Sequence, residues 1–319
     1  MSLIERAVER LDQLRQAGAD TSPESGTREA PASTAAAPSK LAEETAEPDA
    51  RAAEALPKTH SKLVEIDIER LGKLGFITPR LPRSTIADEF RVIKRPLLQN
   101  AEGRSAAQAE NANLIMITSA LPGEGKSFTA INLAISMAME LDHTVLLVDA
   151  DVSRPSVLST LALAPEKGLM DLLTGEVSDP SDVMLRTNIE KLSILPAGTP
   201  HQRATEFLAS EAMNGLLQEM AKRYSERVIV FDSPPLLATT EARVLATHMG
   251  QVVLVVESER TPQSSVRHAL GTIESCPIKL MVLNKSREKA LRAYGYAYGY
   301  GYGYGYGRND RKEARADMA

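Results

Sequence analysis

Cysteine and aromatic residues are scarce in this sequence. Its 319 residues include one cysteine, Cys276, and no tryptophan, and aromatic side chains make up 4% of the chain. A single cysteine excludes an intramolecular disulfide and predicts a reducing, cytoplasmic environment. Outside one stretch near the C-terminus the chain has a single tyrosine, Tyr224. Nearly all the phenols are therefore concentrated in one place, and that concentration needs a functional explanation.

Long apolar runs and an excess of positive charge are also missing. The strongest apolar runs have the length of strands, whereas a transmembrane helix needs ~20 predominantly apolar residues. The N-terminus carries acidic side chains, which is not typical of a signal peptide. The net charge of the chain is -5, whereas a nucleic-acid-binding domain usually carries an excess of positive charge. We therefore expect no nucleic-acid partner. We expect the chain to lie on the cytoplasmic side, peripheral to the inner membrane, and to be attached there through another protein.

Composition divides the chain into five segments. An apolar pattern at helical spacing predicts a short amphipathic helix over residues 1–18. Residues 19–58 contain almost no large apolar side chain, which predicts a disordered linker. Ordered composition returns over 59–112, where we expect a helical extension. An α/β domain over 113–290 follows, and a tail over 291–319 completes the chain.

Six short apolar runs alternate with helical stretches between Leu114 and Asn284. In chain order the runs read "LIMIT", "TVLLVD", "LSILPA", "RVIVFD", "VVLVVE" and "KLMVLN". Nearly continuous, β-branched runs of this length are typical of strands that are buried on both faces of a parallel sheet. The alternation predicts an α/β fold with a doubly wound, mostly parallel sheet flanked by helices.

The segment after the first predicted strand has the pattern of a phosphate-binding loop. Ala120 to Ser127 read A-x-x-x-x-G-K-S, in which glycines let N–H groups point toward phosphate oxygens at the start of a helix. Lys126 would place its charge on the β- and γ-phosphates, and Ser127 would bind Mg²⁺. The alternative is a glycine turn that enters an ordinary helix. The expected nucleotide-binding residues of this segment are Pro122, Gly123, Glu124, Gly125, Lys126, Ser127 and Phe128.

Acidic residues follow two of the predicted strands. Asp149 and Asp232 each end an apolar run, and Asp151 follows two residues after the first. Functional side chains gather at the carboxyl ends of strands in an open parallel sheet. We therefore expect these acids and Lys126 to be catalytic, with Asp232 as a second Mg²⁺ ligand. A lone aspartate in such a place is more often a helix N-cap. Asn284 ends the last run, where it would contact an adenine edge or serve only as a turn residue.

Seven of the eight tyrosines stand in one glycine-spaced stretch of the tail. Glycine between the phenols denies this stretch a side-chain core and predicts a mobile backbone. Mobility suits a substrate segment that must reach an active site, be modified and withdraw. The alternative is a low-complexity or adhesive segment without chemistry. The expected phosphate acceptors are Tyr294, Tyr296, Tyr298, Tyr300, Tyr302, Tyr304 and Tyr306.

Taken together, these motifs resemble those of the bacterial tyrosine autokinases, the BY-kinases of exopolysaccharide synthesis and export. The resemblance rests on "ALPGEGKS" at 120–127, "LLVDADVSRPS" at 146–156, "FDSPPLL" at 231–237 and the tyrosine tail. "EFRVIKRPLL" at 89–98 is similar to the exosortase-associated subgroup. The resemblance implies a P-loop kinase domain over 113–290 that uses ATP and Mg²⁺ and phosphorylates its own tyrosine cluster, with Asp149 near the acceptor hydroxyl and the metal.

The resemblance also implies partners. In many members a helix of the form E-x-x-R-x-x-R mediates contacts in a ring-like homo-oligomer, and the matching positions here are Asp88, Arg91 and Lys94. They lie in a helix expected around residues 87–100. Lysine cannot make the bidentate contact of arginine, so the last contact would be weaker than in those members. A separate membrane activator of the chain-length-determinant type and a cognate tyrosine phosphatase are the other implied partners.

Two other functions stay open at this point. MinD/ParA-type ATPases share the fold and the strand-ending acids, but they carry a lysine directly after the first loop position, where this chain has Leu121. The second alternative is a non-catalytic scaffold that binds nucleotide within the polysaccharide machinery.

Overall fold

The computed structural model describes residues 61–105, 109–223 and 227–286. All of them lie in one compact unit of the chain, residues 57–319. The predicted N-terminal helix, the linker and the tail with its seven tyrosines lie outside the described residues and stay predictions. Within the described ranges, no helix combines the length and the apolar composition needed to cross a membrane.

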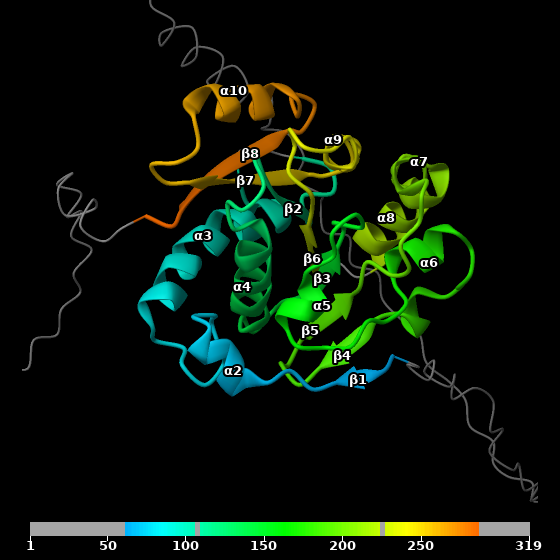
Figure 1. Ribbon diagram of the computed structural model, residues 1–319. Coiled ribbons are helices and arrows are strands. Elements are labelled where there is room, and N and C mark those ends of the chain that lie inside the picture. The colour runs from blue at the N-terminus through cyan, green and yellow to red at the C-terminus, as the bar shows by residue number, and fades with distance from the viewer. Residues whose placement is uncertain (1–60, 106–108, 224–226, 287–319) are drawn as a thin grey trace, which may run out of the picture. The chain divides into compact units, whose positions relative to one another are not determined.

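One sheet of eight strands organises the described residues (Figure 1). Its order is β1-β4-β5-β3-β6-β2-β7-β8, and neighbouring strands are parallel except for β4 and β5. Helices connect the parallel strands across the sheet, which confirms the predicted doubly wound α/β fold. The strands are β1 Leu63–Val64, β2 Leu114–Ser119, β3 Thr144–Asp149, β4 Leu185–Thr187, β5 Leu192–Leu195, β6 Arg227–Asp232, β7 Gln251–Glu257 and β8 Ile278–Asn284.

The central strands are buried on both faces, as their composition predicts. Every residue of β2 is buried, and so is every residue of β3 and β6 after the first. All six apolar runs of the sequence form strands of this sheet. The sequence pattern does not predict β1 and β4, because these strands are two and three residues long and partly exposed.

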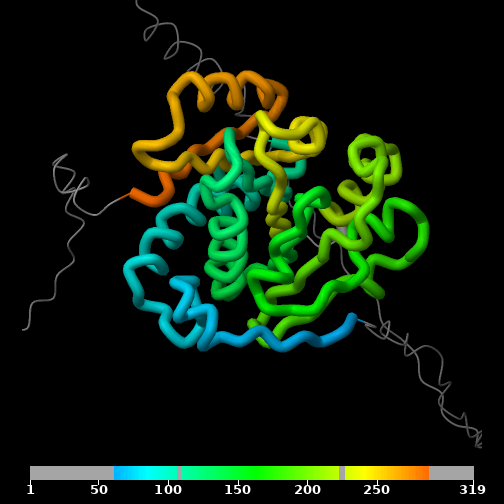
Figure 2. Tube along the Cα trace, viewed as in Figure 1, coloured from blue at the N-terminus to red at the C-terminus, as the bar shows by residue number. Residues whose placement is uncertain are grey.

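Helices cover both faces of the sheet (Figures 1 and 2). On one face α2 to α5 bury side chains such as Leu71 and Phe90, and on the other α6 to α10 bury side chains such as Leu169 and Met213. The helices are α2 Ile68–Lys73, α3 Thr85–Ala101, α4 Lys126–Ala138, α5 Val157–Thr160, α6 Leu169–Leu173, the 3₁₀ helix Pro180–Asp182, α7 Ala204–Leu208, α8 Glu211–Arg223, α9 Glu241–Ala246 and α10 Gln263–Gly271.

The segment before β2, expected as a helical extension, is part of the same core. β1 pairs with β4, and Ile66 and Phe90 are buried with the side chains of α4. Ser84 begins α3 by accepting a hydrogen bond from the N–H of Ala87, and apolar side chains then recur on the face toward α4. The segment therefore contributes one strand, β1, and two helices, α2 and α3, to the fold.

Helix α3 carries the three positions that the sequence assigns to a subunit interface. Lys94 is buried: its Nζ donates to the carbonyl of Ser136 at 2.5 Å and lies 2.7 Å from Oε1 of Glu140. Asp88 and Arg91 form an ion pair with each other on the exposed side of the helix. The structure thus places Lys94 inside the subunit, which corrects its expected role. An interface on this helix would rest on Asp88 and Arg91.

Candidate active site

The phosphate loop connects β2 to α4, and glycine is required at two of its positions. Gly123 and Gly125 have φ values of +86° and +98°, which L side chains rarely adopt. A Cβ on Gly125 would also lie 2.1 Å from Nδ2 of Asn284. Gly125 precedes α4 without a side chain that caps the helix, so the first-turn N–H groups are available to an anion. This geometry suits the binding of a phosphate group.

Lys126 projects from the first turn of α4 toward β3. Its Nζ lies 2.8 Å from Oδ2 of Asp151, and both side chains are largely buried, at 14% and 5% exposure. Asp151 also accepts hydrogen bonds from the N–H of Arg154, through its side chain at 3.2 Å and its carbonyl at 3.1 Å. Lys126 and Asp151, which the sequence predicts to be catalytic, are therefore in direct contact.

Asp149 and Asp232 lie side by side, because they are register partners on the neighbouring strands β3 and β6. Oδ2 of Asp149 accepts hydrogen bonds from the N–H groups of Ser156 at 3.0 Å and Val157 at 2.9 Å. The N-cap of α5 is Ser156, so Asp149 does not cap that helix as its N-cap residue but accepts N–H groups at its start. Oδ1 of Asp149 and Oδ1 of Asp232 are buried without a hydrogen-bond partner. Ser156 Oγ lies 3.5 Å from Asp232 Oδ2.

Burial changes the acidity of both carboxyls. It raises the pKa of Asp149 to about 6, against the lowering effect of the N–H groups of Val157 and Ser156. It raises the pKa of Asp232 to about 7, although the positive charge of Lys126 acts in the opposite direction. Two neighbouring buried carboxyls of this kind favour the arrival of a cation.

The oxygen atoms at this edge of the sheet fit Mg²⁺. Ser127 Oγ lies 2.8 Å from Ser156 Oγ, next to Asp232, and the carboxyl oxygens that lack partners are hard ligands of the kind that Mg²⁺ prefers. The residues that the structure describes contain no group of three or more His, Cys, Asp or Glu side chains arranged to hold a metal alone. That is compatible with Mg²⁺, which is usually held by one or two carboxylates together with substrate phosphates and water.

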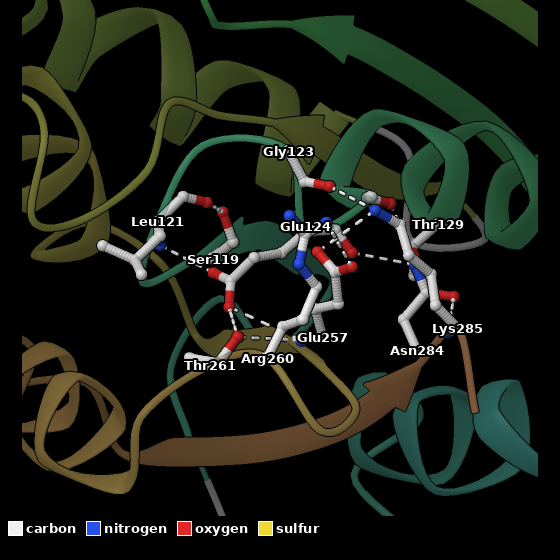
Figure 3. Close-up of polar contacts among 11 residues, drawn as sticks. Ser119, Leu121, Gly123, Glu124, Thr129, Glu257, Arg260, Thr261, Asn284 and Lys285 are labelled. Atoms are coloured by element: carbon white, nitrogen blue, oxygen red, sulfur yellow. Dashed lines mark hydrogen bonds and ion pairs between the residues drawn. The ribbon is translucent and has the colours of Figure 1, made fainter. Parts of the chain in front are cut away.

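Two residues that the sequence assigns to nucleotide binding make other contacts through their side chains. The ring of Phe128 packs on the ring of Phe76 with centroids 4.8 Å apart, on the core side of α4. Only the main chain of Phe128 is left to face a phosphate. Nδ2 of Asn284 donates to the carbonyl of Glu124 at 2.8 Å (Figure 3). Asn284 therefore contacts the loop itself in this structure.

An apolar cavity of about 330 Å³ borders the site at Asp149, and the sequence pattern does not predict it. Asp171 shapes its far wall: its Oδ2 accepts hydrogen bonds from the N–H groups of Gly168 at 2.7 Å and Thr199 at 3.1 Å. The bond from Thr199 joins Asp171 to the end of the segment 195–199 across 28 residues of sequence. The cavity is lined by Asp149, Pro155, Leu158, Ser159, Leu163, Pro165, Glu166, Pro196, Ala197, Gly198 and Pro200.

Comparisons with known proteins agree with this geometry. A family model described as an AAA domain matches residues 112–284. The tyrosine-protein kinase YwqD of Bacillus subtilis (strain 168) is 32% identical over 217 residues, which cover 67% of this chain and 87% of YwqD. The succinoglycan biosynthesis transport protein ExoP of Rhizobium meliloti (strain 1021) is 34% identical over 242 residues, which cover 74% of this chain and 29% of ExoP.

Solved structures include the kinase domain of the Escherichia coli tyrosine kinase ETK. It is 27% identical, with a TM-score of 0.57, and the match covers 72% of this chain and 86% of that domain. The matched region of the family model runs from β2 to the end of β8 and so contains the phosphate loop and all three acids. The chain therefore belongs to the bacterial tyrosine-protein kinases, a family of P-loop nucleoside triphosphatases.

Proposed function

We propose that this chain transfers the γ-phosphoryl group of ATP to tyrosines of its own C-terminal tail and thereby regulates exopolysaccharide synthesis. One observation carries the proposal: the phosphate loop with Lys126 faces two buried carboxyls, Asp149 and Asp232, on neighbouring strand ends. Phosphoryl transfer needs mainly positioning and charge stabilisation, and this arrangement supplies both. The proposed acceptors are the tail tyrosines Tyr294, Tyr296, Tyr298, Tyr300, Tyr302, Tyr304 and Tyr306.

In this proposal the loop binds the phosphates of ATP, and the strand ends contribute to the Mg²⁺ site. The N–H groups of Gly123 to Ser127 would bind the phosphates, and Lys126 would exchange Asp151 for the β- and γ-phosphates. Ser127 and Asp232 would hold Mg²⁺, which when bound neutralises phosphate charge. The hydroxyl of Ser127 and the carboxyl of Asp232 already converge near Ser156, which supports this assignment.

The apolar cavity beside Asp149 suits the ring of an incoming tyrosine. Its walls include prolines and leucines, and the carboxyl of Asp149 lies at its border. The phenolic oxygen would attack the γ-phosphorus, the bond to the β,γ-bridging oxygen would break, and ADP would leave with that electron pair. The phenolic proton would pass to Asp149. Because a free phenol has a pKa near ~10, a carboxylate placed at its hydroxyl assists this step.

The proposed partners follow from the relatives. ExoP is named as a transport protein of succinoglycan biosynthesis, which supports a polysaccharide system and a membrane activator of the chain-length-determinant type. We further propose a ring-like homo-oligomer with Asp88 and Arg91 at its interface, a cognate tyrosine phosphatase, and a position at the cytoplasmic face of the inner membrane. In such an oligomer each tail would reach the site of a neighbouring subunit.

Labelled ATP tests the proposal directly. The purified full chain is incubated with ATP and Mg²⁺, and the phosphate is mapped by mass spectrometry, with Tyr224 as an internal tyrosine outside the tail. Phosphotyrosine at 294–306, lost when the seven tyrosines are replaced by phenylalanine, supports the autokinase. ATP hydrolysis without modification would indicate a MinD/ParA-like ATPase, and binding without turnover would indicate a scaffold.

A further inference from the structure

Two side chains at the end of β8, those of Asn284 and Lys285, donate hydrogen bonds to main-chain carbonyls of the phosphate loop (Figure 3). Nδ2 of Asn284 donates to the carbonyl of Glu124 at 2.8 Å. Nζ of Lys285 donates to the carbonyl of Gly123 at 2.6 Å and lies 3.2 Å from Oε2 of Glu257 at the end of β7. Two consecutive carbonyls of the loop are therefore turned toward the end of β8.

The direction of these carbonyls determines the direction of two N–H groups. The described residues contain no cis peptide bond. In a trans peptide the C=O of one residue and the N–H of the next point in opposite directions. The N–H groups of Glu124 and Gly125 thus point away from the end of β8. N–H groups in this place are the ones that cradle phosphates.

The side chain of Glu124 supports the same conformation. It is a buried carboxylate, 2% exposed, in a loop built to bind anions. Its Oε2 accepts the N–H of Leu121 at 2.6 Å, and its Oε1 accepts the hydroxyl of Thr261, before α10. Both carboxylate oxygens therefore have hydrogen-bond partners within the protein, one in the loop at Leu121 and one at Thr261.

Lys285 has an unfavourable backbone conformation for a lysine. Its φ is +57°, in the left-handed region that favours glycine. A side chain that stays in such a conformation and donates to the loop indicates a role for the ammonium group itself.

We propose that Asn284 and Lys285 are positioning residues, which preorganise the phosphate loop by orienting the N–H groups of Glu124 and Gly125 toward the β-phosphate of a bound nucleotide. The proposal rests on the nucleotide site of the proposed function, but it does not depend on transfer to tyrosine. It gives Asn284 a role in the loop in place of the adenine contact that the sequence leaves open.

Binding of ADP and of tripolyphosphate, a ligand without a base, tests the proposal by calorimetry on the full chain. We expect Lys285→Met and Asn284→Ala each to weaken both ligands by the same factor, about tenfold, as for the loss of a hydrogen bond to an ordered site. Lys73→Met, at an exposed lysine of α2, should change neither ligand. Unchanged tripolyphosphate affinity in both variants would overturn the proposal, and loss of ADP affinity alone in Asn284→Ala would show that Asn284 contacts the base.

Lys285→Gly separates positioning from folding. Glycine accepts the φ of +57° without strain, so the melting temperature without ligand should stay the same or rise while the affinity for tripolyphosphate falls as in Lys285→Met. A variant that binds tripolyphosphate as tightly as the wild type would contradict the role of the ammonium group. A wild-type chain that binds neither ligand would instead overturn the proposed function.

Discussion

Nζ of Lys126 and Oδ2 of Asp151 lie 2.8 Å apart, and both side chains are largely shielded from water. The lysine that would bind the phosphates of ATP is thus already paired with a carboxylate of its own chain. A nucleotide must replace that carboxylate, so the strength of the pair opposes nucleotide affinity. The contact also orients Lys126 toward the strand ends, where the reaction would take place.

Replacement of Asp151 is expected to separate binding from turnover. Asp151→Asn removes the competing charge, so ADP without Mg²⁺ should bind about tenfold more tightly, as for loss of one close charge. Autophosphorylation should fall, because Lys126 is no longer oriented. Lys126→Met is the matched change at the other partner and should lose both binding and transfer. Calorimetry with ADP and a phosphorylation assay check both variants, and equal ADP affinity in wild type and Asp151→Asn would show that the pair does not oppose binding.

The buried acids predict an unusual dependence of stability on pH. Burial raises the folded-state pKa values of Asp149 and Asp232 to about 6 and about 7. The folded state therefore holds more protons than the unfolded chain between pH ~4 and ~7, and the stabilising contribution, fully present below pH ~4, is lost as the pH rises through these values. The resulting decrease in the free energy of unfolding is on the order of a few kcal/mol.

Chemical denaturation at several pH values, without metal or nucleotide, measures this effect. The free energy of unfolding of the wild type should fall relative to that of Asp232→Asn between pH 4 and 7, since the amide does not titrate. Parallel curves for the two proteins would contradict the raised pKa. Mg²⁺ should stabilise the wild type more at pH 8 than at pH 5, because it binds the ionised carboxyls.

The cavity beside Asp149 predicts that a change in its wall affects KM for the tyrosine substrate and not KM for ATP. Leu163 is one of its walls, and Leu163→Ser makes that wall polar. We expect KM for a tyrosine-rich tail peptide to rise about tenfold, as for loss of a buried leucine contact, while KM for ATP stays the same. Leu141→Ser, at a leucine that is 86% exposed, is the matched control. A change in KM for ATP alone would place the cavity outside the acceptor path.

Helix α3 offers a test that separates assembly from folding. Lys94→Met should lower the melting temperature, because it removes a buried contact to Ser136 and Glu140. Arg91→Ala should leave the melting temperature nearly unchanged, since its pair with Asp88 is exposed, but it should reduce the molar mass of the assembly. Light scattering and thermal denaturation check both variants. If only Lys94→Met reduces the molar mass of the assembly, the interface depends on Lys94 and not on Arg91.

The local pattern of the sequence was sufficient for six of the eight strands of the sheet and for the position of the phosphate loop. A strand buried on both faces must be apolar along its whole length, and a phosphate loop must have glycine where φ is positive, so these constraints are visible residue by residue. β2, β3 and β6 and the loop glycines Gly123 and Gly125 were predictable for this reason.

The tertiary structure alone decided which side chains meet. Apolar periodicity reports whether a residue is buried, but it does not identify the partner. Asn284 contacts the loop across 160 residues of sequence, because the strand order places β7 beside β2 and β8 directly beyond β7. Lys94 carries a charge that is typical of surfaces, and its burial depends on a carbonyl and a carboxylate that α4 and the turn after it bring to α3. Such contacts follow from packing across the fold, which no local pattern encodes.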